Sequence, residues 1–87
     1  MKILEIRDIT KKHLHLHYRN EFRGAAVFEY TKNNTEEIPV EFSIEHSATG
    51  AVDISARMLK KINYPLLPAI KSLKDHIREL EKTGKLM

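Results

Sequence analysis

The sequence predicts an α+β fold: a four- to five-stranded antiparallel sheet with one C-terminal amphipathic helix packed on one sheet face. Two observations predict it. Apolar and polar residues alternate with period two in several short segments before residue 59, and apolar residues recur at helical spacing after residue 65. The predicted order is therefore β-β-β-β-β-α. With 87 residues the chain has the size of a single domain, residues 1–87.

The first three strands are predicted at residues 2–9, 12–19 and 24–31. The second contains the strictly alternating run His13-Leu14-His15-Leu16-His17-Tyr18. Asn20 to Gly24 is predicted to be a turn that contains Phe22. In the third strand, Ala26, Phe28 and Tyr30 share one face.

Two more strands are predicted at residues 38–46 and 51–58. Lys32-Asn33-Asn34-Thr35 is a loop signal, because Asn tolerates left-handed backbone conformations. Pro39 can open a strand, where a missing N–H does little harm, and Gly50 marks a hairpin. The apolar face of these strands is predicted to consist of Val40, Phe42, Ile44, Val52, Ile54, Ala56 and Met58.

A helix is predicted over residues 65–83. Asn63 can cap it, Pro65 suits its first turn, and Gly84 can end it. Its apolar residues occupy about 80° of arc, a narrow stripe that we expect to lie on the apolar face of the sheet. The stripe consists of Leu66, Ile70, Leu73, Ile77 and Leu80.

Composition and charge limit the classes of protein. The chain has no Cys, which fits a reducing compartment and excludes disulfides and thiolate metal sites. Charges in the first eight residues argue against a signal peptide, and no run approaches the ~18 apolar residues needed to span a membrane. We therefore expect a cytoplasmic protein with no membrane partner. Of the net charge of +3, residues 1–56 contribute 7 − 9 = −2 and residues 57–87 contribute 8 − 3 = +5.

The histidine-rich strand is one candidate site. His13, His15 and His17 share a strand face, with successive Cα atoms about 6.6 Å apart. Two imidazoles at this spacing can reach one metal ion, but the outer two lie about 13 Å apart, too far for all three to share it. A site would need Glu41, Glu45 or Asp53 from another strand. We expect no tightly bound metal and read these histidines as residues of the solvent-facing side.

The basic helix stripe is the other candidate site. It consists of Lys71, Lys74, Arg78, Lys82 and Lys85. On one helix these residues would lie within about 80° of arc and span about 21 Å, enough to follow several phosphates of a nucleic acid. The alternative is a solvated helix face supported by Lys71–Asp75 and Glu81–Lys85 pairs. Aromatic residues that point inward, such as Phe28 and Phe42, would leave few rings on which bases could stack.

Catalytic and cofactor motifs are missing from the sequence. There is no Gly-x-Ser-x-Gly elbow, no His-Glu-x-x-His pair and no glycine-rich phosphate loop, since the three glycines stand apart at positions 24, 50 and 84. We therefore predict a small non-enzymatic binding module without a cofactor. A small catalytic or metal-binding domain is the remote alternative.

The order of strands followed by a helix, with the segment Leu16-His17-Tyr18-Arg19-Asn20-Glu21-Phe22-Arg23-Gly24, resembles PUR-type nucleic-acid-binding repeats. The resemblance covers about a quarter of the chain, and the strand near Val52 departs from that repeat. It implies nucleic-acid binding as the function.

The alternative function is a protein-interaction or self-assembling module that acts through homodimerisation. A small core and free sheet edges favour self-association. The contact would use an edge strand or the apolar residues Met58, Leu59, Leu66, Leu67 and Leu86.

Overall fold

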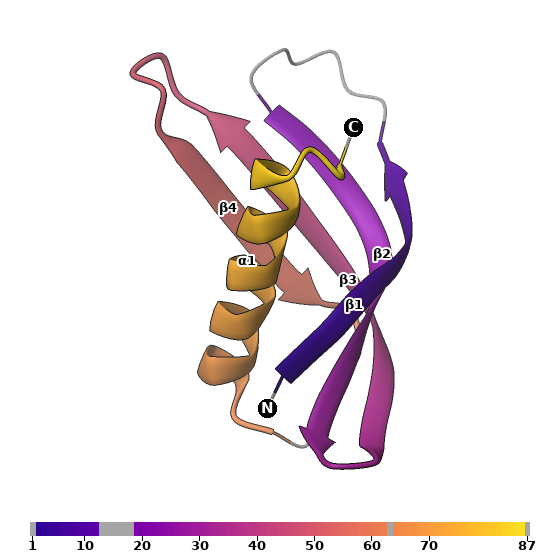
Figure 1. Ribbon diagram of the computed structural model, residues 1–87. Helices are drawn as coiled ribbons and strands as arrows, with labels where there is room; N and C mark the ends of the chain where they lie inside the picture. The colour runs from indigo at the N-terminus through magenta and orange to yellow at the C-terminus, as the bar shows by residue number, and fades with distance from the viewer. Residues whose placement is uncertain (1, 13–18, 63, 87) are drawn as a thin grey trace.

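The computed structural model describes residues 2–12, 19–62 and 64–86. It confirms the predicted α+β fold, an antiparallel sheet with one C-terminal helix on one of its faces (Figure 1). In the described residues the sheet has four strands, in the order β1-β2-β3-β4. The elements are β1 Lys2–Lys11, β2 Arg19–Thr31, β3 Asn34–His46, β4 Val52–Met58 and α1 Leu66–Lys82.

β2 corrects one prediction, since Asn20 to Gly24 is not a turn. This segment continues the strand, and Phe22 pairs with Phe42 of β3. The two rings stack with centroids 5.1 Å apart, and Phe22 is buried. A Cβ atom on Gly24 would lie 3.0 Å from the Arg7 carbonyl oxygen, so glycine lets β1 approach here. Turn-forming residues are overridden by pairing on both sides.

The predicted strand at 12–19 lies mainly on residues outside the described ranges, as do Leu14, Leu16 and Tyr18 of its proposed core face. β3 also begins earlier than predicted, at Asn34, because the turn takes only Lys32 and Asn33, with Asn33 at φ +67°. The hairpin at Gly50, with φ +89°, is where the sequence predicts it.

Pro39 does not open β3 but lies inside it, and hydrogen-bond direction explains why it is tolerated. The Pro39 carbonyl oxygen accepts a bond from the Leu59 amide at 2.8 Å, just beyond the end of β4. The N and O of one strand residue point to the same side, so the missing N–H faces the end of β4. The ladder between β2 and β3 therefore loses nothing at Pro39.

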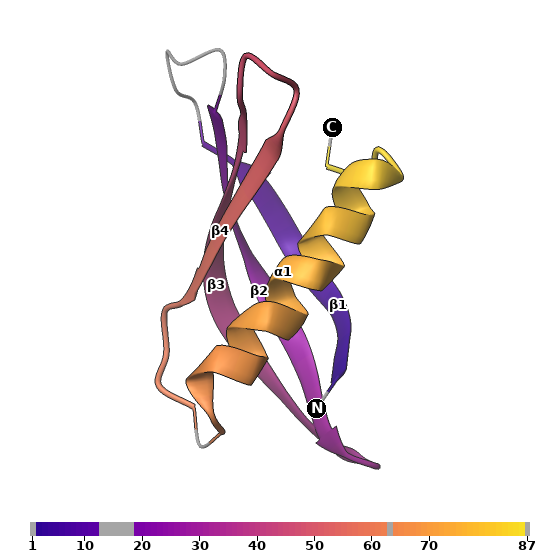
Figure 2. The same ribbon diagram turned by 90° about the vertical axis from the view of Figure 1, so that its left-hand side faces the viewer.

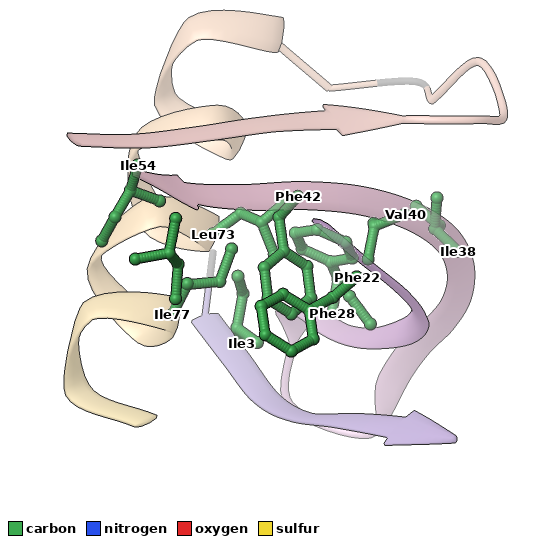
Figure 3. Packing of buried hydrophobic residues seen from close by; sticks show 11 residues of the cluster. Ile3, Phe22, Phe28, Ile38, Val40, Phe42, Ile54, Leu73 and Ile77 are labelled. Carbon is green, nitrogen blue, oxygen red and sulfur yellow. The ribbon is translucent and has the colours of Figure 1, made fainter. Parts of the chain in front are cut away.

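The apolar core lies between the sheet and α1 (Figure 3). Leu73 and Ile77 of the helix are fully buried, as predicted, but Leu66 is 58 % exposed. Ala69, one turn before Leu73, is the third buried helix residue. Val52, predicted to be in the core, is 39 % exposed. The core consists of Ile3, Phe22, Ala26, Phe28, Ile38, Val40, Phe42, Ile44, Ile54, Leu73 and Ile77.

The C-terminal end of α1 is fixed by its backbone. Gly84 has φ +72°, its amide bonds to the Glu81 carbonyl, and the Lys85 amide bonds to the Leu80 carbonyl. This is a Schellman motif, which requires a left-handed residue that glycine adopts without strain. The chain then turns back, and Leu86 packs against the core. At the other end Pro65 precedes the helix without a side-chain cap, and Asn63 lies outside the described residues.

Candidate functional site

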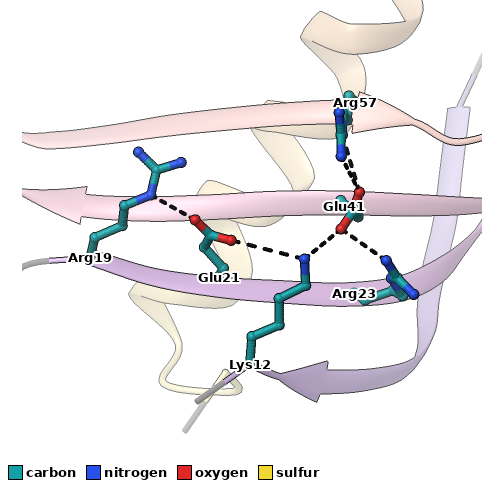
Figure 4. Close-up of polar contacts among 6 residues, drawn as sticks. All are labelled: Lys12, Arg19, Glu21, Arg23, Glu41 and Arg57. Atoms are coloured by element: carbon teal, nitrogen blue, oxygen red, sulfur yellow. Dashed lines mark hydrogen bonds and ion pairs between the residues drawn. The ribbon is translucent and has the colours of Figure 1, made fainter. Parts of the chain in front are cut away.

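One face of the sheet has no helix on it, and its side chains form a charged cluster (Figures 2 and 4). Alternate residues of three strands meet there because of the register: Arg23 of β2 and Arg57 of β4 both pair with Glu41 of β3. Lys12, just after β1, reaches the same place. We call the cluster of Lys12, Arg19, Glu21, Arg23, Glu41 and Arg57 the open-face cluster.

Glu41 is the centre of the open-face cluster. Its residue is only 8 % exposed, and its carboxylate accepts hydrogen bonds from three cations. Lys12 Nζ lies at 2.6 Å, Arg23 Nη2 at 3.1 Å and Arg57 Nε at 3.1 Å. These bonds, with that of Lys12 the strongest influence, lower the pKa of Glu41 to about 2. The carboxylate is therefore ionised throughout the physiological range.

Glu21 extends the cluster, since Arg19 Nε lies 3.1 Å from one of its carboxylate oxygens and Lys12 Nζ 3.9 Å from the other. Beside these ion pairs lies a shallow depression of about 370 Å³. It forms where the short side chains of Ser43 and Ser55, opposite each other on β3 and β4, stand between longer ones. Each cation of the cluster is already bonded to a carboxylate, so its charge is largely neutralised locally.

Sequence reasoning missed the open-face cluster. It placed Glu41 and Arg57 on the solvent-facing side of the sheet, and it considered Glu41 only as a metal ligand. Among the described residues, no three His, Cys, Asp or Glu side chains come close enough to hold a metal ion. His13, His15 and His17 lie outside the described residues. The alternation of polar residues was the available signal, but the strand register it needed was unknown.

The basic helix stripe is confirmed only in part as a geometric unit. Lys71, Lys74, Arg78 and Lys82 belong to α1 and lie on the side turned away from the buried residues. Lys85 does not, because it follows the Schellman motif. Instead it borders a hollow beside Ile9 and Lys11 near the end of β1. We call the four helical cations the helix cations.

The helix cations differ from those of the open-face cluster in their partners. Arg78 Nη1 lies 3.4 Å from an Asp75 carboxylate oxygen. Lys71, Lys74 and Lys82 form no ion pair with any residue in the described part of the chain. The surface also carries Asp75, Glu79 and Glu81, so α1 as a whole has a net charge of 4 − 3 = +1.

Apolar residues proposed for a self-contact divide into two groups. Leu59 is 42 % exposed and Leu67 is 81 % exposed, so both can meet another molecule, as can Leu66. Met58 and Leu86 instead pack against the core of this chain. The exposed leucines lie around the connection from β4 to α1.

Comparisons with known proteins place the chain in a family. The model of the BB_0187 family matches residues 1–82. Neither the curated proteins nor the solved structures contain a match to the chain. In the described residues, the one helix is too short and too polar to cross a membrane.

Proposed function

The chain belongs to the BB_0187 family, and we propose that it is a small non-enzymatic module that binds nucleic acid through the helix cations. The observation that carries the proposal is the absence of ion-pair partners for Lys71, Lys74 and Lys82 among the described residues. A cation without a carboxylate partner can bind a phosphate without first breaking an ion pair. Its contact releases a counterion from the nucleic acid and gains free energy.

Spacing supports the same proposal. Residues 71 to 82 of a helix span about 16 Å at 1.5 Å per residue, a length that covers a few consecutive phosphates. Lys71 and Lys82 are exposed at the two ends of this span, and Arg78 is exposed between them. The open-face cluster is a weaker candidate, because each of its cations would have to leave Glu21 or Glu41.

The proposed contact reads the backbone and not the bases. Phe22, Phe28 and Phe42 are all buried, so none of these rings can stack on a base. Lysine side chains meet phosphates as point charges, without sequence information. We therefore expect binding with little sequence preference. The proposed location is the cytoplasm, which fits a chain without cysteine.

A charge-reversal experiment tests the proposal. In Lys71→Glu/Lys82→Glu, affinity for an oligonucleotide should be lost while the melting temperature hardly changes, because both side chains face solvent. For the unaltered protein, three or four phosphate contacts give a slope of log K against log salt of roughly −3 to −4. Fluorescence anisotropy with labelled single- and double-stranded DNA and RNA measures both quantities.

The matched control is Lys2→Glu/Lys32→Glu, which changes the net charge equally at two exposed lysines outside α1. It should lower affinity far less than the helix variant. Equal losses in the two variants would mean that only net charge matters. No binding of the unaltered protein at about 50 mM salt would exclude the proposed function.

A second candidate function is self-assembly as a homodimer. The specific observation that favours it is the regular outer strand β4, with the exposed residues Val52 and Leu59 at its ends. Strand edges of this kind pair readily with another strand. Sedimentation velocity over a range of protein concentrations tests it, since a dimer shows a mass that rises with concentration.

A further inference from the structure

The two outer strands of the sheet differ in regularity. β1 shifts register against β2 between Ile3 and Glu5 and again between Arg7 and Thr10, where Asp8 has φ +53°. β4 pairs with β3 from Val52 to Met58 without a shift. Bulges and twists protect an edge from pairing with another chain, and β4 has none. Figure 2 shows β4 uncovered along its length, with α1 beside it on one side of the sheet only.

The hydrogen-bond pattern shows which groups of β4 point outward. The Leu59 amide donates to Pro39 of β3, so Leu59 points toward β3. Strand residues alternate in direction, so Asp53, Ser55 and Arg57 also point their backbone N–H and C=O toward β3. The even-numbered residues, 52 to 58, therefore present theirs at the outer edge.

We propose that β4 pairs antiparallel with β4 of a second copy of the chain, about a two-fold axis at Ser55. The proposal specifies the contact of the self-assembly named above as the second candidate function, and it rests on that function. In this register each even-numbered residue opposes an even-numbered residue of the partner. Ile54 opposes the partner's Ala56, and Val52 opposes the partner's Met58. Four such pairs exchange two bonds each, about eight hydrogen bonds in all.

Charge complementarity selects this register. Asp53 opposes Glu45 of β3, a like-charged pair that is unfavourable, and it forms no ion pair with any described residue. The Ser55 axis places the partner's Arg57 opposite Asp53 in a non-hydrogen-bonded pair, where Cα atoms lie about 4.5 Å apart. Arg57 uses Nε and Nη2 for Glu41, while its Nη1 has no hydrogen bond in the described residues. It can therefore bind Glu41 and the partner's Asp53 together.

Neighbouring registers lack this match. An axis at Ile54 places Asp53 opposite the partner's Ser55, and an axis at Ala56 places it opposite the partner's Leu59. Both also leave part of the strand without a partner. On the helix side, the Ser55 axis brings the 39 %-exposed Val52 against the partner's Met58, which covers apolar surface. Hydrogen bonds, charge and apolar contact all agree on one register.

The test is Asp53→Lys in the full chain. The introduced lysine would oppose the partner's Arg57 at two symmetric positions, so we expect dimerisation to weaken by about tenfold or more. Within one chain, however, the introduced lysine faces Glu45, and the substitution removes a like-charge pair. The thermal stability of the dissociated variant should therefore equal or exceed that of the unaltered monomer. Sedimentation velocity from about 10 µM to about 1 mM and circular dichroism measure the two effects.

The control is Glu79→Lys, which makes the same charge change at an exposed position of α1 and should leave the dimer intact. Ala56→Pro is a second variant: it removes an outward N–H and no bond to β3, so it should also dissociate the dimer if the variant folds. A dimer that persists in Asp53→Lys would overturn the register but not self-assembly. A monomer at all concentrations in the unaltered protein would overturn both.

Discussion

The two faces of the sheet lose their water in different ways. On the covered face, Phe28, Leu73 and Ile77 are fully buried by packing against one another. On the open face, Glu41 is nearly as inaccessible, at 8 % exposure, but the groups that cover it are three cationic side chains. The strand backbone between them is the same. The comparison shows that one β-strand can support two kinds of interaction with different responses to mutation, pH and salt.

The difference follows from the physics of each face. Apolar contacts depend on volume, because a cavity left in a dense interior cannot be filled by its neighbours. The Glu41 ion pairs depend on charge, and cations such as Arg57, with a side chain 73 % exposed, remain in contact with solvent. Changes in side-chain size should therefore act mainly on the covered face, and changes in pH mainly on the open face.

The largest expected effect is on the covered face. Leu73→Ala should lower the free energy of unfolding by about 2–5 kcal/mol, because Leu73 is fully buried. A small domain has only about 5–15 kcal/mol in total, so the loss should be plain in urea denaturation. Leu67→Ala is the control, since Leu67 is 81 % exposed, and it should change stability by about 0.5 kcal/mol at most. Similar losses in the two variants would show that α1 is not docked through Leu73.

The next effect concerns the open face and depends on pH. The pKa of Glu41 falls from 4.5 to about 2 in the folded protein, so its ion pairs stabilise the fold above pH 4.5. That stabilisation is lost as the pH falls toward 2, because the unfolded chain takes up the proton first. Glu41→Gln should therefore be less stable than the unaltered protein at neutral pH. The two stabilities should converge between about pH 4.5 and pH 2. Urea unfolding at several pH values measures this, and parallel curves would contradict it.

The smallest effect is expected at the margin of the covered face. Tyr30 donates a hydrogen bond of 2.8 Å to Glu36, and burial, helped by this bond, raises the pKa of Tyr30 to about 12. The unfolded chain ionises near pH 10, so this stabilisation is lost as the pH rises from 10 toward 12. Tyr30→Phe should cost about 1 kcal/mol at neutral pH, where one hydrogen bond is removed.

The cost of Tyr30→Phe should shrink at about pH 11, since phenylalanine does not ionise. Glu36 stays bonded to Lys60 at 3.1 Å in the variant, so no carboxylate is left alone. Thermal melts at the two pH values provide the comparison. A cost that stays constant or grows with pH would show that the hydroxyl does not titrate as described.

Predictability along the chain followed the range of the interactions. The core positions Phe28, Phe42 and Ile54 could be predicted because alternation is a local pattern. The segment Asn20 to Gly24 could not, because its turn-forming residues are held in β2 by Phe42 on one side and by β1 on the other. Leu66 matched the helical period, yet it lies at the first position of α1, where it remains exposed.

The sequence by itself determined the fold class, the helix and its end at Gly84, and the division of the sheet into an apolar and a polar face. These depend on periods of two and 3.6 residues and on backbone conformations that single residues favour. Only the tertiary structure decided that Lys12, Arg23 and Arg57 meet at Glu41, because they come from segments that strand register alone brings together. Register also left β4 as an outer strand with Asp53 opposite Glu45. Both features arise from pairing between distant segments, which no local pattern specifies.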